Sequence, residues 1–300
     1  MKDLALKNKK LIIIFGIVFG LITLLVILHF TLFSLKTVEV DFKTENHVFS
    51  TEAIHGIKGD SSINKGGSIF GVNKKEITNS LESNNAYLKV INIETVFPNK
   101  IVIHCAEREE TYAVKTKDHK YFICDSEFKV LYITYSYSTS NQTNPILLKG
   151  LENLIENEYS ANAGDFLKFS AEGEILKSIG QNLLKANKTV AMQKALIKSI
   201  ELTSGIYYYT AQNQPYLVVE DFNGFKTNIY ALNTLLDKKF EAMFLTLSQV
   251  VYDPEVFFKD EIEDGELTLQ TVPNNYYLNY VLDILEDNNS KLQIKLKKVA

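Results

Sequence analysis

A stretch of 23 residues, Leu11 to Phe33, contains no Asp, Glu, Lys or Arg. As an α-helix it would be about 34 Å long, enough to cross a hydrocarbon core about 30 Å thick. It exceeds the apolar part of a cleaved signal peptide, roughly 7–15 residues, and no good small-residue cleavage site follows it. A buried helix of a globular domain would keep a polar face. The sequence therefore predicts a single membrane-spanning helix over residues 11–33.

The charges beside this stretch predict its orientation. Residues 1–10 carry four lysines and one aspartate, a net charge of +3, which the positive-inside rule places in the cytoplasm. Subtracting +3 from the whole-chain charge of −4 leaves −7 for the rest of the chain. We therefore expect a cytoplasmic tail over 1–10 and an acidic part outside the cytoplasm, with no nucleic-acid partner.

Residues 34–107 begin with a predicted strand and two helices. Apolar and polar residues alternate over 35–42, which indicates a strand with one buried face. Ser50 is a suitable N-cap for a helix ending near residue 57. Asn73 and Glu76 have the spacing of a capping box and predict a second helix.

The loop between these helices contains three glycines, Gly66, Gly67 and Gly71. It lacks the Gly-Lys-Ser/Thr ending of a P-loop, so phosphate binding has little support. We interpret the loop as a flexible connection.

A β-hairpin is predicted at the end of this module. Its strands cover residues 89–97 and about 101–105, and Pro98-Asn99 is a favourable turn between them. The apolar side chains expected on one face are Ile91, Ile93 and Phe97 in the first strand, and Ile101, Ile103 and Cys105 in the second.

This β-α-α-β-β order, directly after one apolar helix, resembles the POTRA domain of the FtsQ/DivIB family of bacterial cell-division proteins. The local matches are Leu35–Val40, Ser68–Val72 and Val96–Ile103, and Glu107-Arg108 closes the module as is typical of the family. The chain departs from the family at Glu110, where a proline is usual.

Arg108 is the only arginine in the chain and lies at the predicted junction between two modules. Its planar guanidinium could clamp a carboxylate or backbone carbonyls and fix the angle between the modules. The alternative is an exposed side chain of little energetic consequence.

Residues 108–285 are predicted to form a mostly antiparallel β domain with flanking helices, so that the fold class is α+β. The predicted strands lie at 111–115, 120–124, 129–134, 196–202, 206–210, 216–220 and 225–230. Helices are expected near 175–183 and over 231–247, where apolar residues recur at helical spacing.

The end of the chain carries the predicted interaction site. Residues 266–272 and 276–282 have the pattern of a hairpin, whose edge could pair with another chain or could simply complete the sheet. The candidate contact residues are Leu267, Leu269, Tyr276, Tyr277 and Tyr280. The resemblance implies that these last strands recruit division proteins of the FtsB/DivIC and FtsL type. Residues 286–300 are set apart as a tail, although the alternation over 291–299 is also that of an edge strand.

No catalytic or metal-binding pattern emerges from the sequence. The five histidines lack metal-site spacing, and there is no Gly-x-Ser-x-Gly motif. Cys105 and Cys124 are expected to be free thiols, with a disulfide between them as the alternative. We therefore expect no enzyme activity, no cofactor and no small-molecule substrate.

Together these features predict a single-pass membrane protein that acts as a scaffold for division proteins at the septum. Two other functions stay open. One is an export or envelope-assembly factor, since POTRA modules occur in such proteins. The other is an exported enzyme or sensor with an unrecognised site.

Overall fold

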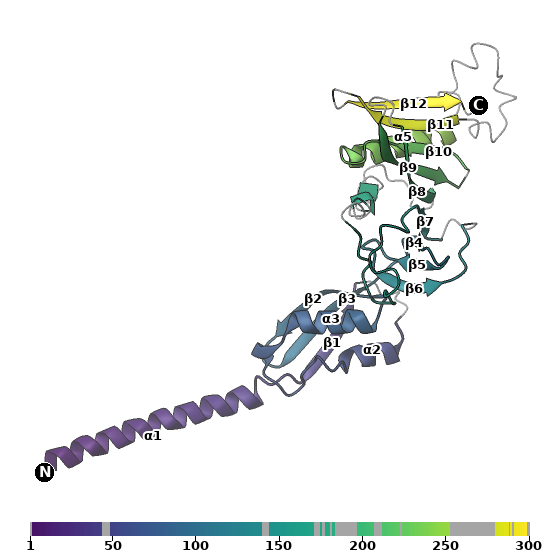
Figure 1. The fold of residues 1–300 in the computed structure, drawn as a ribbon. Helices are drawn as coiled ribbons and strands as arrows, with labels where there is room; N and C mark the ends of the chain where they lie inside the picture. Colours follow the sequence, from purple (N-terminus) through teal and green to yellow (C-terminus); the bar gives the residue numbers. More distant parts are fainter. Residues whose placement is uncertain are drawn as a thin grey trace. The chain divides into compact units, whose positions relative to one another are not determined.

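The computed structural model describes residues 2–43, 49–139, 144–170, 175, 178–180, 182–183, 197–206, 212–222, 224–252, 280–287, 289 and 291–298. The chain divides into two units, Met1–Arg108 and Glu109–Ala300, and each is described by itself below (Figure 1).

The chain begins with helix α1, Lys2–Thr31. Its apolar side chains between Ile14 and Ile27 are about half exposed or more. The hydroxyls of Thr23 and Thr31 donate to the carbonyls of Phe19 and Ile27, so these polar groups are satisfied within the helix. Within the described residues, no helix has the combined length and hydropathy needed to cross a membrane.

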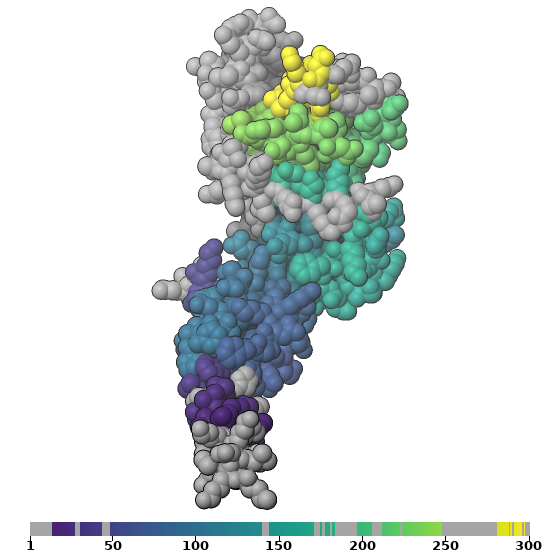
Figure 2. Space-filling view, turned by 90° about the vertical axis from the view of Figure 1, so that its left-hand side faces the viewer, coloured from purple at the N-terminus to yellow at the C-terminus, as the bar shows by residue number. Residues whose placement is uncertain are grey.

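The first unit has the predicted β-α-α-β-β order. Its strands are β1 (Thr37–Phe42), β2 (Leu88–Val96) and β3 (Lys100–Glu107), and its helices are α2 (Thr51–Lys58), the short 3₁₀ helix η1 (Ile69–Gly71) and α3 (Lys74–Asn84). The sheet order is β1-β3-β2, with β1 parallel and β2 antiparallel to the central β3. In Figure 2 the described part of α1, in purple, joins the blue surface of this unit.

Local side-chain bonds explain where the two helices begin. The Ser50 hydroxyl accepts a hydrogen bond from the amide of Ala53, 3.2 Å away, at the start of α2. At the start of α3, Asn73 accepts from the Glu76 amide at 3.2 Å and donates to the Glu76 carboxylate at 3.0 Å. Asn73 is thus the N-cap of α3, and its second bond to Glu76 joins the two side chains, where a capping box has a bond from the backbone amide of the cap. Ile77 and Leu81 of α3 then pack into the core.

Three expectations for this unit are wrong, and the first is that Phe97 shares the face of Ile93, because Phe97 is exposed whereas Ile93 is buried. The register of β2 shifts between Val90 and Asn92, so Ile91 faces solvent (51% exposed) while Ile93 is buried. A β-bulge reverses the alternation that the sequence pattern assumes. The glycine loop is also not merely a flexible connection, because Gly66 and Gly67 exchange 2.8 Å backbone hydrogen bonds with Leu35.

The second unit contains one mixed sheet of nine described strands. They are β4 (Tyr112–Lys115), β5 (Tyr121–Cys124), β6 (Val130–Thr134), β7 (Ile146–Lys149), β8 (Ile197–Ile206), β9 (Asn213–Asp221), β10 (Lys226–Ile229), β11 (Tyr280–Glu286) and β12 (Leu292–Lys298). The order is β12-β11-β10-β9-β8-β7-β4-β5-β6. The α+β class is thus correct, but "mostly antiparallel" is too simple. The pairs β4–β7, β7–β8 and β10–β11 are parallel.

Helix α5 (Leu236–Tyr252) begins five residues later than predicted. Ala231 and Leu235 have positive φ angles of 51° and 48°, which a right-handed helix does not allow. Phe240 and Phe244 of α5 are buried in the same core as Leu282 of β11. The long connection through α5 is what allows β10 and β11 to lie parallel.

Candidate functional site

The candidate site is the end of the large sheet formed by β11 and β12. Strand β12 is the first strand in the sheet order and pairs antiparallel with β11 from Leu292 to Lys298. Strand β11 lies between β12 and the parallel strand β10. The outermost described strand is therefore β12, which lies in the segment that the sequence set apart as a tail.

At the opposite end of the sheet, the chain itself covers part of the edge strand. The Val130 amide of β6 donates to the Asp165 carbonyl at 2.8 Å, and the Val130 carbonyl accepts from Gly164 at the same distance. Strand β6 is thereby partly capped by the loop at residues 164–167. Within the described residues, the strand pairing of β12 is with β11.

The turn between β11 and β12 is built around Asp287. Its carboxylate accepts hydrogen bonds from the amides of Asn289 and Lys291, at 2.9 and 2.8 Å, and from the Gln293 side chain at 3.4 Å. These donors, the Lys291 amide first, hold the pKa of Asp287 below its usual value. The negative charge thus orders the turn that sets the β11–β12 register.

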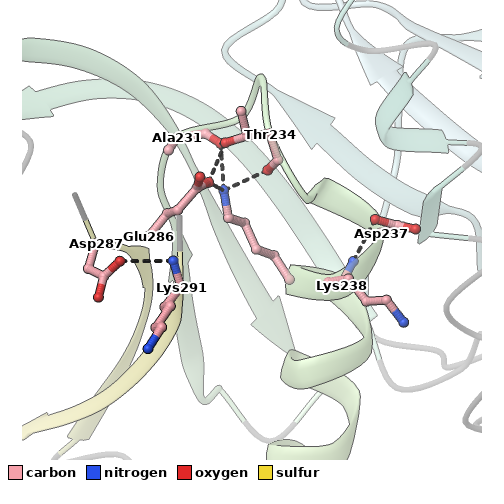
Figure 3. Close-up of polar contacts among 8 residues, drawn as sticks. Ala231, Thr234, Asp237, Lys238, Glu286, Asp287 and Lys291 are labelled. Atoms are coloured by element: carbon pink, nitrogen blue, oxygen red, sulfur yellow. Dashed lines mark hydrogen bonds and ion pairs between the residues drawn. The ribbon is translucent and has the colours of Figure 1, made fainter. Parts of the chain in front are cut away.

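A buried lysine fixes the other side of this turn. The Lys239 ammonium of α5 donates to the carbonyls of Ala231 and Thr234, at 2.6 and 2.7 Å, and lies 3.1 Å from the Glu286 carboxylate. Figure 3 shows the labelled Ala231, Thr234 and Glu286 close to one another. The Lys239 side chain is completely buried. Burial lowers its pKa, and Glu286 opposes that shift. Lys239 therefore ties the irregular start of α5 to the last residue of β11.

The strand β12 is rich in lysine and presents an apolar residue to solvent. Ile294 is 46% exposed. Lys297 forms an ion pair with the buried Asp283 of β11, which also accepts a 2.9 Å hydrogen bond from Asn228 of β10. A row of polar contacts therefore links the last three strands and holds β12 in register.

Most of the predicted contact residues lie outside the part of the chain that the structure describes. Leu267, Leu269, Tyr276 and Tyr277 lie outside the described residues, as does the predicted strand at 266–272. Tyr280 begins β11, opposite Lys298. The described hairpin uses residues 280–286 and 292–298.

The two predicted junction residues lie at the end of the first unit. Glu107 closes β3 opposite Leu88 of β2. Arg108 is 5% exposed, and its guanidinium donates to the Leu88 carbonyl at 3.2 Å and to Glu82 of α3 at 2.9 Å. Arg108 therefore clamps a carboxylate and a carbonyl and is not an exposed side chain. Both partners, Glu82 and Leu88, belong to the first unit, as Arg108 does.

Within the described residues, no group of three or more His, Cys, Asp or Glu side chains could hold a metal ion. Cys105 and Cys124 are both free and buried. Burial raises the pKa of Cys105 to about 12 and that of Cys124 well above its ordinary value, so both stay protonated at neutral pH.

Comparison with known proteins identifies the first unit. Residues 33–108 match the family of the POTRA domain, FtsQ-type. The chain is also 39% identical over 113 residues to the cell division protein DivIB of Clostridium tetani. The match covers 37% of this chain and 40% of that protein. The resemblance to FtsQ/DivIB proteins is thereby confirmed.

Proposed function

We propose that this chain, which carries an FtsQ-type POTRA domain, is a membrane-anchored scaffold of the cell-division machinery without catalysis of its own. Proteins of this family are generally non-catalytic. The observation that best supports a scaffold is the placement of β12 at the end of a nine-stranded sheet, because an edge strand can add a strand from a partner.

Residues 11–33 would provide the membrane anchor. The support for the anchor is the uncharged 23-residue stretch together with the apolar side chains that α1 exposes between Ile14 and Ile27. The four lysines before it would keep the N-terminus in the cytoplasm, with residues 34–300 outside and the protein concentrated at the septum.

Partner capture would use β12 by strand addition. The segment Leu292–Lys298 is the outermost described strand of the sheet, and Ile294 supplies an exposed apolar contact. The resemblance suggests partners of the FtsB/DivIC and FtsL type. Leu267, Leu269, Tyr276, Tyr277 and Tyr280 precede or begin β11 in the chain and stay predicted contacts of the same partner.

Co-purification from membranes tests this proposal. The Ile294→Asp variant of the full chain should capture FtsB/DivIC-type and FtsL-type proteins at least about tenfold less than the unaltered chain, because a desolvated charge opposes strand addition. Ile91→Asp is the matched control, since Ile91 is also an exposed strand isoleucine but lies in the first unit. Equal capture by all three chains would exclude β12 as the binding edge.

Localisation separates the scaffold from the other candidate functions. A fluorescent fusion of the full chain should concentrate at the septum of dividing cells. An even distribution around the cell periphery would instead favour an export or envelope-assembly factor.

A further inference from the structure

Three phenylalanine rings form an exposed row at the end of the first unit where α1 enters it. The ring centroids of Phe33 and Phe70 are 5.3 Å apart, and so are those of Phe70 and Phe97. Phe70 is 61% exposed and Phe97 is 59% exposed. The rings therefore contact one another without entering the core, and we call this row the Phe33–Phe70–Phe97 cluster.

The backbone holds the three rings in place. The Ile69 amide donates to the Phe33 carbonyl at 2.8 Å, and Ser34 and Ser68 form an antiparallel bridge next to that bond. Ile69 is buried, so its neighbour Phe70 in η1 points outward. These contacts attach the glycine loop to the chain that leaves α1.

The turn between β2 and β3 brings the third ring to the same place. The Lys36 amide donates to the Asn99 carbonyl at 2.8 Å, which puts this turn beside the residues that follow α1. Phe97 directly precedes the turn residues Pro98 and Asn99. Three segments that are far apart in the sequence thus supply one aromatic surface.

Polar and charged groups around the cluster have the character of a membrane interface. Phe33 is the last residue of the uncharged stretch, and the preceding Leu32 is 44% exposed. Lys36 and Lys65 are exposed on the segments that carry the cluster. Phe and Leu side chains at the boundary of headgroups and acyl chains, with lysines able to reach lipid phosphates, are typical of surfaces that rest on a bilayer.

We propose that the Phe33–Phe70–Phe97 cluster docks the POTRA unit onto the outer surface of the bilayer, with Phe70 and Phe97 inserted among lipid headgroups. The argument for lipid as the occupant is continuity, because the cluster begins at the residue where the proposed anchor ends. This inference rests on the membrane anchor put forward above. It assigns to the module a lipid-binding surface distinct from the partner-binding edge β12.

A single tryptophan can report the depth of the cluster, because the chain contains no tryptophan. The full-length Phe70→Trp variant is inserted into vesicles of phosphatidylcholine and phosphatidylglycerol. Lipids brominated near the top of the acyl chain should then quench its fluorescence by at least about half. Tyr135→Trp is the control, since Tyr135 is 80% exposed in the second unit, and its emission should respond to aqueous iodide instead.

Vesicle flotation shows whether the full chain is bound to the membrane, independently of the quenching at position 70. If the chain floats with the vesicles and Trp at position 70 is quenched by iodide as strongly as Trp at position 135, the docking proposal is overturned while the anchor stands. If the chain does not float, both the anchor and the docking are overturned. A second variant, Phe70→Trp with Phe97→Ser, should show weaker quenching by brominated lipid than Phe70→Trp alone.

Discussion

The Arg108 guanidinium lies 2.9 Å from the Glu82 carboxylate, and the two side chains are only 2% and 14% exposed. Glu82 also accepts a 2.8 Å hydrogen bond from the Val90 amide of β2. The pair therefore joins α3, β2 and the last residue of the first unit. It explains why the single arginine of the chain stands at this position: a lysine has no planar fork with which to reach both Glu82 and the Leu88 carbonyl.

Removing this arginine should strongly destabilise the first unit. Arg108→Ala leaves the buried Glu82 carboxylate without its counter-charge, which costs about 3–5 kcal/mol. Arg108→Lys should be intermediate, because it keeps the charge and loses one of the two directions of bonding. Hydrogen exchange of the α3 and β2 amides, measured on the full chain, would give these differences.

Two further variants separate the buried pair from a general effect of charge. The double variant Arg108→Met with Glu82→Leu should recover part of the loss, since a buried ion pair contributes little net stability over an apolar pair, while the Val90 amide and the Leu88 carbonyl lose their side-chain partners. The partly exposed pair Lys198–Glu220 is the control, and Lys198→Met should cost at most about 1 kcal/mol. If the double variant is as unstable as Arg108→Ala, the ion pair is not the cause.

The adjacent lysines Lys238 and Lys239 of α5 should contribute very differently to the stability of the second unit. Lys239→Met removes the buried charged donor that two carbonyls and the Glu286 carboxylate share, at a cost of about 3 kcal/mol. Lys238 is 62% exposed and pairs with Glu241, so Lys238→Met should change stability by less than about 1 kcal/mol. Hydrogen exchange in β11 would measure both, and similar effects of the two substitutions would contradict the role given to Lys239.

The sequence is most informative where structure is local. The caps at Ser50 and Asn73 depend on residues three positions away, and both are confirmed. The face of β2 is mispredicted because a bulge at Ile91 depends on pairing with β3. The short strand β7 was missed because its four residues follow a loop and pair with strands distant in the chain.

The same limit applies to the candidate site. Lys239 and Glu286 are 47 positions apart, and no spacing in the sequence relates them. The alternation over residues 291–299 did indicate a strand, now seen as β12. That pattern could not say which of the last strands is outermost, because strand order depends on the parallel pairing of β10 with β11.

Both cysteines should be unreactive in the native protein. Burial raises the pKa of the Cys105 thiol to about 12 and also that of Cys124, so neither forms a thiolate near neutral pH. A disulfide-exchange reagent at mildly alkaline pH should therefore label neither thiol rapidly. In guanidinium chloride without reductant it should label both, and fewer than two reactive thiols would indicate a disulfide.

Gly150 should not tolerate a side chain. It follows β7 with a φ angle of +75°, and a Cβ there would clash with the Leu202 carbonyl of β8. Gly150→Ala is expected to destabilise the second unit by about 3 kcal/mol, combining backbone strain and steric overlap. Gly56→Ala is the contrasting variant: no atom would crowd its Cβ within α2, so it should stabilise by up to about 1 kcal/mol. Thermal unfolding followed by circular dichroism would distinguish the two.

Asp60 should make the stability of the first unit depend on acidic pH. Its carboxylate accepts hydrogen bonds from Ser62, from the Ser80 hydroxyl at 2.8 Å and from the Asn84 amide at 3.2 Å, and so links the end of α2 to α3. Burial favours the neutral acid, but these donors outweigh it and the pKa of Asp60 falls below its usual value. Because the folded pKa is lower than the unfolded one, the stabilisation is complete above about pH 4 and is lost as the pH falls through the folded pKa.

At neutral pH, Asp60→Asn should therefore cost about 1 kcal/mol of stability, and its deficit relative to the unaltered chain should shrink on acidification. Asp118→Asn, at an exposed position of the second unit, should leave the exchange of α2 and α3 amides unchanged at every pH. A deficit for Asp60→Asn that stays constant from neutral to acidic pH would show that the ionised carboxylate does not hold α2 and α3 together.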